Sequence, residues 1–187
     1  FRARPKQVQG IIAGGAHALT RSIEGAEDDP EAGARAVQFR GVNKKDVVIG
    51  IAANGRTPFV WGAMEEASAR GARTALVCFN PNMKRRAGVP QLILAPKIGP
   101  EVLTGSTRLK AGTATKLILN CITTLAMVRL GKVCENLMVD LDPKNKKLRD
   151  RAVRIVRTLT GTEAHEARAA LEKSGWVVKA AVGSLKP

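Results

Sequence analysis

Four short apolar runs, each ending in turn-forming residues, constrain the fold of this chain more than any other feature. The runs cover residues 8–13, 47–52, 74–79 and 92–95, and glycine, asparagine or proline follows closely on each. None of them alternates cleanly between apolar and polar residues. Near-continuous apolar runs are typical of parallel strands that are covered on both faces, so we expect four parallel strands.

The segments between these runs have the composition of helices. We expect helices over residues 16–26, from Asp29 onward, over 57–70 and over 104–130. Asp29 followed by Pro30 and Glu31 is typical of an N-cap, a first-turn proline and an acidic first turn. Alternating strands and helices predict an α/β fold, namely a three-layer αβα sandwich with a parallel sheet.

The pattern changes after Asp140, where three short helical segments follow one another. A chain breaker at residues 142–145 precedes an amphipathic segment at 147–159, and shorter segments follow at 164–173 and 176–182. We therefore expect two domains: residues 1–142, and a small three-helix C-terminal unit over residues 143–187.

The net charge of +15 raises the question of a nucleic-acid partner. Lys and Arg are scattered along the chain, however, and their tight clusters are short. Aromatic residues, which stack on bases, make up only 3% of the sequence. We therefore expect a solvated basic surface and no nucleic-acid partner. A basic surface also suits a small anionic substrate.

The most apolar stretch covers residues 117–128. A membrane-spanning helix needs about 20 apolar residues, so we expect a buried helix here, no membrane partner and a cytoplasmic protein. The chain opens on Phe1 without an apolar leader, so we expect its true start to lie upstream. The three cysteines lack a C-x-x-C spacing and the two histidines lie far from them, so we expect no metal and no other cofactor.

Two segments have the composition of an anion-binding site at the carboxyl ends of parallel strands. The first is the turn of Asn54, Gly55, Arg56 and Thr57, which joins a strand to a helix whose free N–H groups favour anions. A strand–glycine–helix turn that binds no ligand explains this turn equally well.

The second segment gathers hydroxyl groups and cations at the entrance of the long apolar helix. Ser106 and Thr107 are able to cap that helix or to donate to a phosphate, and Arg108 and Lys110 add positive charge. A solvated helix start explains the hydroxyl groups, but it does not explain the run of small residues beside the apolar stretch.

A third segment, residues 23–29, holds two carboxylates at helical spacing. Glu24 and Glu27 stand three positions apart, so on a helix they share one face. Carboxylates near a helix C-terminus oppose the helix dipole, which makes the placement mildly unfavourable. A carboxylate pair beside a sugar site is able to take up or donate protons, although a surface acidic cluster explains the residues without any chemistry.

Taken together, residues 24–28, 50–60 and 101–140 closely resemble the bacterial N-acetylmuramic acid 6-phosphate etherases. These enzymes belong to the sugar isomerase (SIS) domain group, in which the glucokinase regulatory protein is a relative. The resemblance implies an SIS-type fold, a small sugar-phosphate substrate and a homodimer. It also implies metal-free cleavage of the D-lactyl ether by elimination and water addition, a lyase activity in amino-sugar catabolism and peptidoglycan recycling.

The same resemblance implies roles for individual residues. Glu27, the second glutamate of the family motif Glu-Gly-Ala-Glu-Asp, takes the role of the base that removes the C2 proton of the sugar, and Glu24 lines the sugar pocket. The remaining implied residues surround the sugar phosphate: Asn54, Gly55, Arg56 and Thr57 in the turn, with Ser106, Thr107 and Lys110 in the second segment.

Two departures from the family pattern concern this site. Asn54 stands where the family turn usually has serine, and its amide is able to donate a hydrogen bond to phosphate with a different reach. The family's other catalytic glutamate, which protonates the leaving oxygen, belongs with a first glycine-rich loop to a segment that we expect upstream of Phe1. On this expectation the chain holds one member of the catalytic pair, and inactivity of the chain on its own would follow.

Three other functions remain open from the sequence. A non-catalytic sugar-phosphate sensor on the same scaffold needs the binding loops but does not need Glu27. An aldose–ketose phosphosugar isomerase is less favoured, because residues 104–140 are etherase-like. A nucleic-acid binder ranks last, because the chain has no recognisable nucleic-acid-binding motif.

Overall fold

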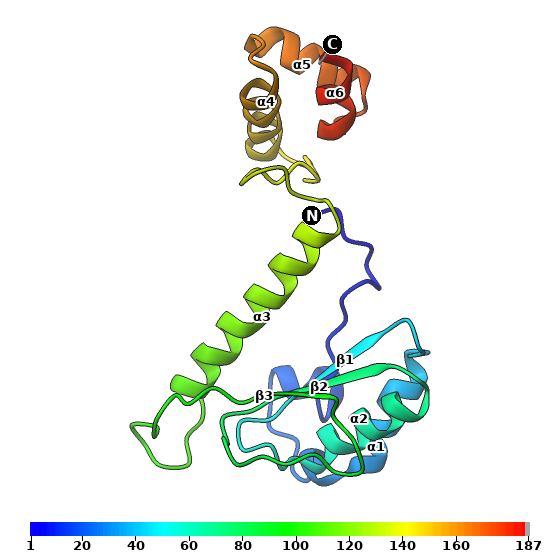
Figure 1. Cartoon of the computed structure of the whole chain (residues 1–187), viewed down its shortest axis with the longest axis vertical. Coiled ribbons are helices and arrows are strands. Elements are labelled where there is room, and N and C mark those ends of the chain that lie inside the picture. Colours follow the sequence, from blue (N-terminus) through cyan, green and yellow to red (C-terminus); the bar gives the residue numbers. More distant parts are fainter. Residues whose placement is uncertain (186–187) are drawn as a thin grey trace. The chain divides into compact units, whose positions relative to one another are not determined.

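The computed structural model describes residues 1–185 and forms two compact units (Figure 1). One unit is Gly10–Leu119, which contains the sheet. The other combines Phe1–Gln9 with the chain from Asn120 onward and contains the C-terminal helices.

Three parallel strands form the sheet of the first unit. They are β1 (Val47–Ile51), β2 (Arg73–Val77) and β3 (Leu92–Leu94), in the order β1-β2-β3. Ile49 of β1 pairs with Ala75 of β2, which in turn pairs with Leu92 of β3. This arrangement confirms the predicted α/β class and three of the four predicted strands.

Two helices lie together on one side of this sheet (Figure 1): α1 (Pro30–Phe39) and α2 (Pro58–Ala69). Asp29 caps α1 as predicted, because its Oδ1 accepts a hydrogen bond from Ala32 N at 2.8 Å. The helices pack closely through two glycines. A Cβ on Gly33 would lie 2.0 Å from Phe59 O, and one on Gly62 would lie 1.9 Å from Pro30 O.

The structure corrects the prediction for the first 28 residues. Residues 8–13 form no strand, and among the described residues they have no strand partner. Residues 16–26 do not form an α-helix; two 3-10 helices, η1 (Gly15–Leu19) and η2 (Ala26–Asp28), lie there instead. Gly25 adopts a left-handed conformation with φ 70° immediately before η2. Since this turn separates Glu24 from Glu27, the two carboxylates do not share a helix face.

The long apolar helix, α3 (Lys110–Arg129), begins later than predicted and ends before Gly131, the predicted stop. The expectation that it is buried is wrong, because Leu117 and Leu125 keep 53% and 63% of their surfaces exposed. By length and composition alone, α3 is long and apolar enough to cross a membrane, whereas the apolar stretch recognised in the sequence was too short. The helix extends that stretch with Ala, Gly and Thr residues together with Lys110, Lys116 and Arg129.

Three helices form the C-terminal unit as the sequence predicts: α4 (Lys146–Thr160), α5 (Ala164–Lys173) and α6 (Val178–Leu185). Asn145 caps α4 by accepting a hydrogen bond from Leu148 N at 2.9 Å, and Glu163 and Glu166 form a reciprocal capping box on α5. The apolar face of α4 contributes Ala152, Ile155 and Val156 to the core of this unit.

Candidate functional site

The turn that follows β1 is held in place by backbone and aromatic contacts. Ala52 N donates to Val77 O of β2 at 3.1 Å, and Gly55 N donates to Ala52 O at 2.8 Å. Gly55 has φ 76°, and a Cβ there would lie 2.5 Å from Met83 Sδ, so only glycine fits. The buried indole of Trp61 donates from Nε1 to Gly55 O at 2.8 Å. The turn is therefore rigid where a ligand would approach it.

Thr57 stands at the N-cap of α2, directly after this turn. Its hydroxyl makes no capping hydrogen bond to the helix, which leaves that group available for a ligand. The first N–H groups of α2 and the positive end of the helix dipole point in the same direction. This end of α2 is suited to a phosphate group.

The segment that precedes α3 is shaped by Glu101 rather than by its hydroxyl residues. Glu101 Oε2 accepts a hydrogen bond from Lys110 N at 3.0 Å, and Oε1 accepts one from Ala111 N at 2.9 Å. These two bonds hold the pKa of Glu101 below its usual range. The expectation that Ser106 or Thr107 caps the helix is therefore replaced by a cap from nine residues upstream.

A cavity of about 620 Å³ gathers side chains from all three candidate segments. Glu27 lines it from η2, Asn54 and Thr57 line it from the turn after β1, and Thr107 lines it from the segment before α3. Residues of β1 form part of the same wall. The cavity thus lies at the carboxyl end of a parallel strand, where α/β folds commonly bind ligands.

The remaining predicted site residues do not line this cavity. Glu24 is exposed and accepts a hydrogen bond from Ser22 Oγ at 3.2 Å. Arg56 is exposed, and Ser106 donates its backbone N–H to Leu103 O. The ammonium group of Lys110 lies near Gly99. Gly55 is buried, and its carbonyl oxygen accepts the hydrogen bond from Trp61.

Two family models match separate parts of the chain. The N-terminal SIS domain of the glucokinase regulatory protein matches residues 2–68, which include the turn after β1 and η2. The C-terminal lid domain of the same protein matches residues 135–183, which include α4 and α5. The SIS match agrees with the parallel sheet and supports the SIS-type fold.

Curated proteins extend this similarity to nearly the whole chain. An N-acetylmuramic acid 6-phosphate etherase of Gloeobacter violaceus is 55% identical over 185 residues, which cover 97% of this chain and 59% of the relative. The chain is a homologue of the N-acetylmuramic acid 6-phosphate etherases. The etherase of Mesorhizobium japonicum is 53% identical over 97% of the chain and 59% of its own length. That of Symbiobacterium thermophilum is 50% identical over 99% and 61%.

The chain therefore spans about three-fifths of the length of the etherases that it matches. The etherase resemblance inferred from residues 24–28, 50–60 and 101–140 is confirmed at the level of sequence similarity. All three segments contribute to the one cavity.

Two residues that matter to this etherase-like site were missed from the sequence. Arg21 lines the cavity, and it is the one Lys or Arg residue that does so in the described part of the chain. Trp61 clamps the turn through Gly55, and the guanidinium of Arg86 lies 4.1 Å from the centre of its ring. Trp61 lies within the predicted helix over residues 57–70, where no local signal marks it as a contact of the turn. Arg21 was hidden in a segment that was predicted to be helical.

Proposed function

We propose that the protein cleaves the D-lactyl ether of N-acetylmuramic acid 6-phosphate, giving N-acetylglucosamine 6-phosphate and D-lactate. The observation that carries this proposal is the cavity that brings the Glu27 carboxylate together with Asn54, Thr57 and Thr107. A carboxylate beside an anion-binding helix start supplies both parts that the reaction needs, a base and a phosphate site. The names of the similar proteins support the same activity.

The proposed chemistry is an elimination followed by an addition. In the open-chain sugar the C2 proton is acidified by the neighbouring aldehyde, and the Glu27 carboxylate removes it. The electron pair of the C2–H bond forms a C2–C3 double bond and the C3–O bond breaks. The oxygen of the departing lactate takes its proton from a general acid, the second catalytic carboxyl group that the family resemblance implies. Water then adds across the double bond. This sequence needs no change of oxidation state and no metal.

The proposed phosphate site combines the turn after β1 with the segment before α3. Thr57 and Thr107 contribute hydroxyl groups, and Asn54 contributes an amide donor in the place of the family serine. Arg56, Ser106 and Lys110 lie in the same segments without lining the cavity. We propose that they approach the phosphate only once it is bound, whereas Glu24 stays at the rim of the sugar pocket.

The experiment compares two glutamine variants. Glu27→Gln is expected to reduce D-lactate release from N-acetylmuramic acid 6-phosphate by roughly 10²- to 10⁴-fold, while binding of N-acetylglucosamine 6-phosphate changes less than about 3-fold. Glu31→Gln is the matched control, because Glu31 is exposed on α1 and pairs with Arg35 outside the cavity. Near-normal turnover by the Glu27 variant would refute the base assignment.

A sugar-phosphate sensor without catalysis is the second candidate. Both family models describe domains of the glucokinase regulatory protein, whereas the similar curated proteins are named etherases and do not favour the sensor. A sensor would bind sugar phosphates in the same cavity without releasing lactate at any enzyme concentration. The lactate assay on the unmodified protein therefore separates the two functions.

We propose further that the protein works as a cytoplasmic homodimer. The exposed apolar side chains of α3, among them Leu117 and Leu125, support a protein contact on this helix. Activity without a nucleic-acid or membrane partner, and a domain boundary near Asp142, stay predictions from the sequence.

A further inference from the structure

Arg21 presents an unpaired cation to the cavity. It follows η1, and its backbone N–H is held by His17 O at 3.1 Å. Within residues 1–185, its guanidinium forms neither a hydrogen bond nor an ion pair within 4 Å. Glu27 lines the same cavity, yet Arg21 is not paired with it. The guanidinium is therefore available to an anion that enters the cavity.

A substrate of the proposed function carries two anionic groups, the phosphate and the carboxylate of the lactyl ether. The N-terminus of α2 and its turn are suited to the phosphate, as described above. The lactyl group is attached to C3, next to the C2 proton that Glu27 would remove. Its carboxylate must therefore lie close to Glu27, and without a cation nearby the two negative charges would repel each other.

We propose that Arg21 binds the lactyl carboxylate and so selects ether-bearing sugar phosphates over sugar phosphates without the ether. This assignment rests on the proposed function. Three observations support it: Arg21 lines the same cavity as Glu27, it is the Lys or Arg residue that lines the cavity in the described chain, and it has no competing partner there. The planar fork of a guanidinium matches the two oxygens of a carboxylate, so the pair forms two parallel hydrogen bonds.

The same contact has a consequence for turnover. The carboxylate is fixed on the group that leaves, so Arg21 would orient the C3–O bond relative to Glu27 in the bound sugar. Arg21 would also offset the repulsion between the lactyl carboxylate and the Glu27 carboxylate. A lysine in its place would keep the charge but lose the two-point contact.

Binding to two ligands tests the assignment. The first ligand, N-acetylmuramic acid 6-phosphate, bears the lactyl carboxylate, and the second, N-acetylglucosamine 6-phosphate, lacks it. Each is titrated calorimetrically into the Glu27→Gln variant, in which turnover is prevented. When Arg21→Met is added to this variant, we expect the affinity for the first ligand to fall roughly 10- to 100-fold and the affinity for the second to fall less than about 2-fold. Arg21→Lys should recover part of the loss. Arg73→Met is the matched control, because Arg73 is exposed on β2 and lies outside the cavity.

The outcomes separate this assignment from the proposed function. Equal weakening of both ligands would overturn the assignment in favour of a phosphate contact, and unchanged binding of both would show that Arg21 touches neither. In either case the proposed function would stand, since both sugars still bind the parent protein. Failure of the parent protein to bind either sugar would overturn the function and the assignment together.

Discussion

Glu101 holds the start of α3 through two hydrogen bonds. Its two carboxylate oxygens accept the backbone N–H groups of Lys110 and Ala111, which would otherwise be unsatisfied at a helix start. We expect Glu101→Ala to fray the first turn of α3 and to displace Thr107 from the cavity wall. Faster amide hydrogen exchange at Lys110 and Ala111, with weaker sugar-phosphate binding, would check this.

The same contact predicts a pH dependence with a defined sign. The two backbone hydrogen bonds lower the pKa of Glu101 from its usual value of 4.5. Its stabilising effect is therefore fully present above pH 4.5 and is lost as the pH falls through the lower folded-state pKa. Glu172→Ala on α5 provides the control, since that carboxylate is exposed and outside this turn. If the amide exchange rate at Lys110 showed the same pH dependence in the unmodified protein and in Glu101→Ala, the prediction would be contradicted.

Local sequence signals predicted some residues and could not predict others. Asp29 was recognisable as a cap because the helix that it caps follows it directly. Glu101 was not, because it caps from nine residues away and only the folded loop brings it there. Among the site residues, Glu27, Asn54, Thr57 and Thr107 were chosen and do share a cavity. Arg21 escaped notice because no local pattern distinguishes a cavity-lining arginine from a solvated one.

At the scale of elements, the contact between α1 and α2 depends on two glycines. An added methyl on Gly33 or Gly62 would collide with the backbone of the other segment, at Phe59 O and Pro30 O respectively. We expect Gly33→Ala and Gly62→Ala each to lower the free energy of unfolding by about 1–3 kcal/mol or more, because the helices must separate. Denaturant titration measures this loss.

Gly112 offers a matched control in α3. A Cβ there would meet only Thr107 O at an ordinary 3.7 Å, so Gly112→Ala should raise stability by about 0.5–1 kcal/mol through helix propensity. Because Thr57 stands at the start of α2, separation of the two helices should also weaken sugar-phosphate binding. Equal stability of the Gly33 and Gly112 variants would contradict the close packing.

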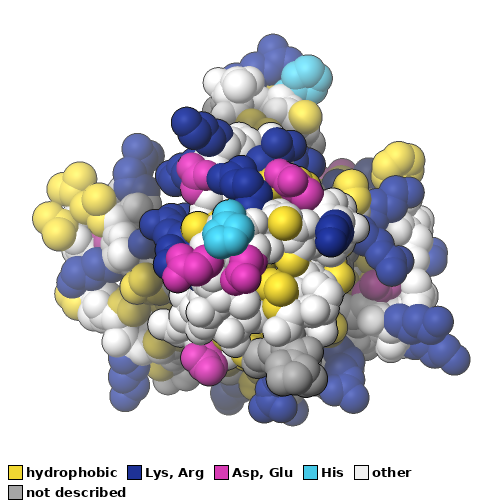
Figure 2. All heavy atoms as spheres, turned by 90° about the horizontal axis from the view of Figure 1, so that it is seen from above, with side chains coloured by type: hydrophobic (Ala, Val, Ile, Leu, Met, Phe, Trp, Pro, Cys, Tyr) yellow, Lys and Arg dark blue, Asp and Glu magenta, His cyan; other side chains and the backbone are white. Residues whose placement is uncertain are grey.

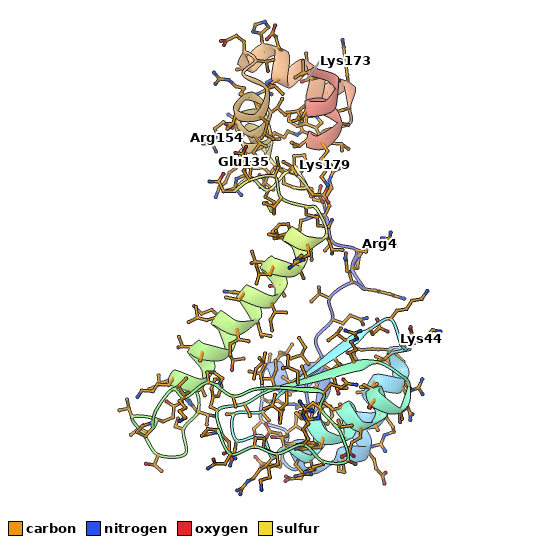
Figure 3. All side chains as sticks on the ribbon, viewed as in Figure 1. Arg4, Lys44, Glu135, Arg154, Lys173 and Lys179 are labelled. Atoms are coloured by element: carbon orange, nitrogen blue, oxygen red, sulfur yellow. The ribbon has the colours of Figure 1, made fainter. Side chains whose placement is uncertain are left out.

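The outer face of α4 concentrates positive charge. Lys147, Arg151 and Arg154 follow one another at spacings of four and three, so neighbouring side chains repel each other. Arg154 projects outward from α4 (Figure 3), and Lys and Arg dominate the charged side chains on the face drawn in Figure 2. At 0.01 M ionic strength we expect Arg151→Glu to stabilise α4 by about 0.5 kcal/mol, with about half that gain for Arg151→Gln. Protection of the α4 amides from hydrogen exchange measures the stability gain in both variants. If the gain persisted in 1 M salt, charge repulsion would be excluded as its cause.

The elements that the sequence predicted well are those that carry their own pattern. The amphipathic period and caps of α4 and α5 are local, and the three strands have apolar runs with clear ends. The two failures, residues 8–13 and 16–26, lie where the backbone depends on partners or on left-handed glycines such as Gly25. A strand needs a neighbour for its hydrogen bonds, and an apolar run alone does not supply one.

At the scale of the whole molecule, the exposed apolar surface of α3 favours binding of a partner that would bury it. Leu125 keeps 63% of its surface exposed and Val128 keeps 41%. Complete burial of such a side chain contributes about 1.5–3 kcal/mol, and a partner that covers α3 gains the share that is still exposed. A second copy of the chain covers this surface in the proposed homodimer. We expect sedimentation equilibrium to give a dimer for the unmodified protein and a monomer for Leu125→Glu, because a charge in an apolar interface is costly.

Phe39 provides the control that distinguishes a specific contact on α3 from non-specific hydrophobic association. It is 90% exposed at the end of α1, so Phe39→Glu removes an equally apolar surface patch without touching α3. If this variant stays dimeric while the Leu125 variant dissociates, the contact belongs to α3. Dissociation of both, or of neither, would contradict a dimer built on this helix. The length and composition of α3 also permit a membrane span. If the protein co-sedimented with phosphatidylcholine vesicles and Leu125→Glu abolished this, the partner of α3 would instead be lipid.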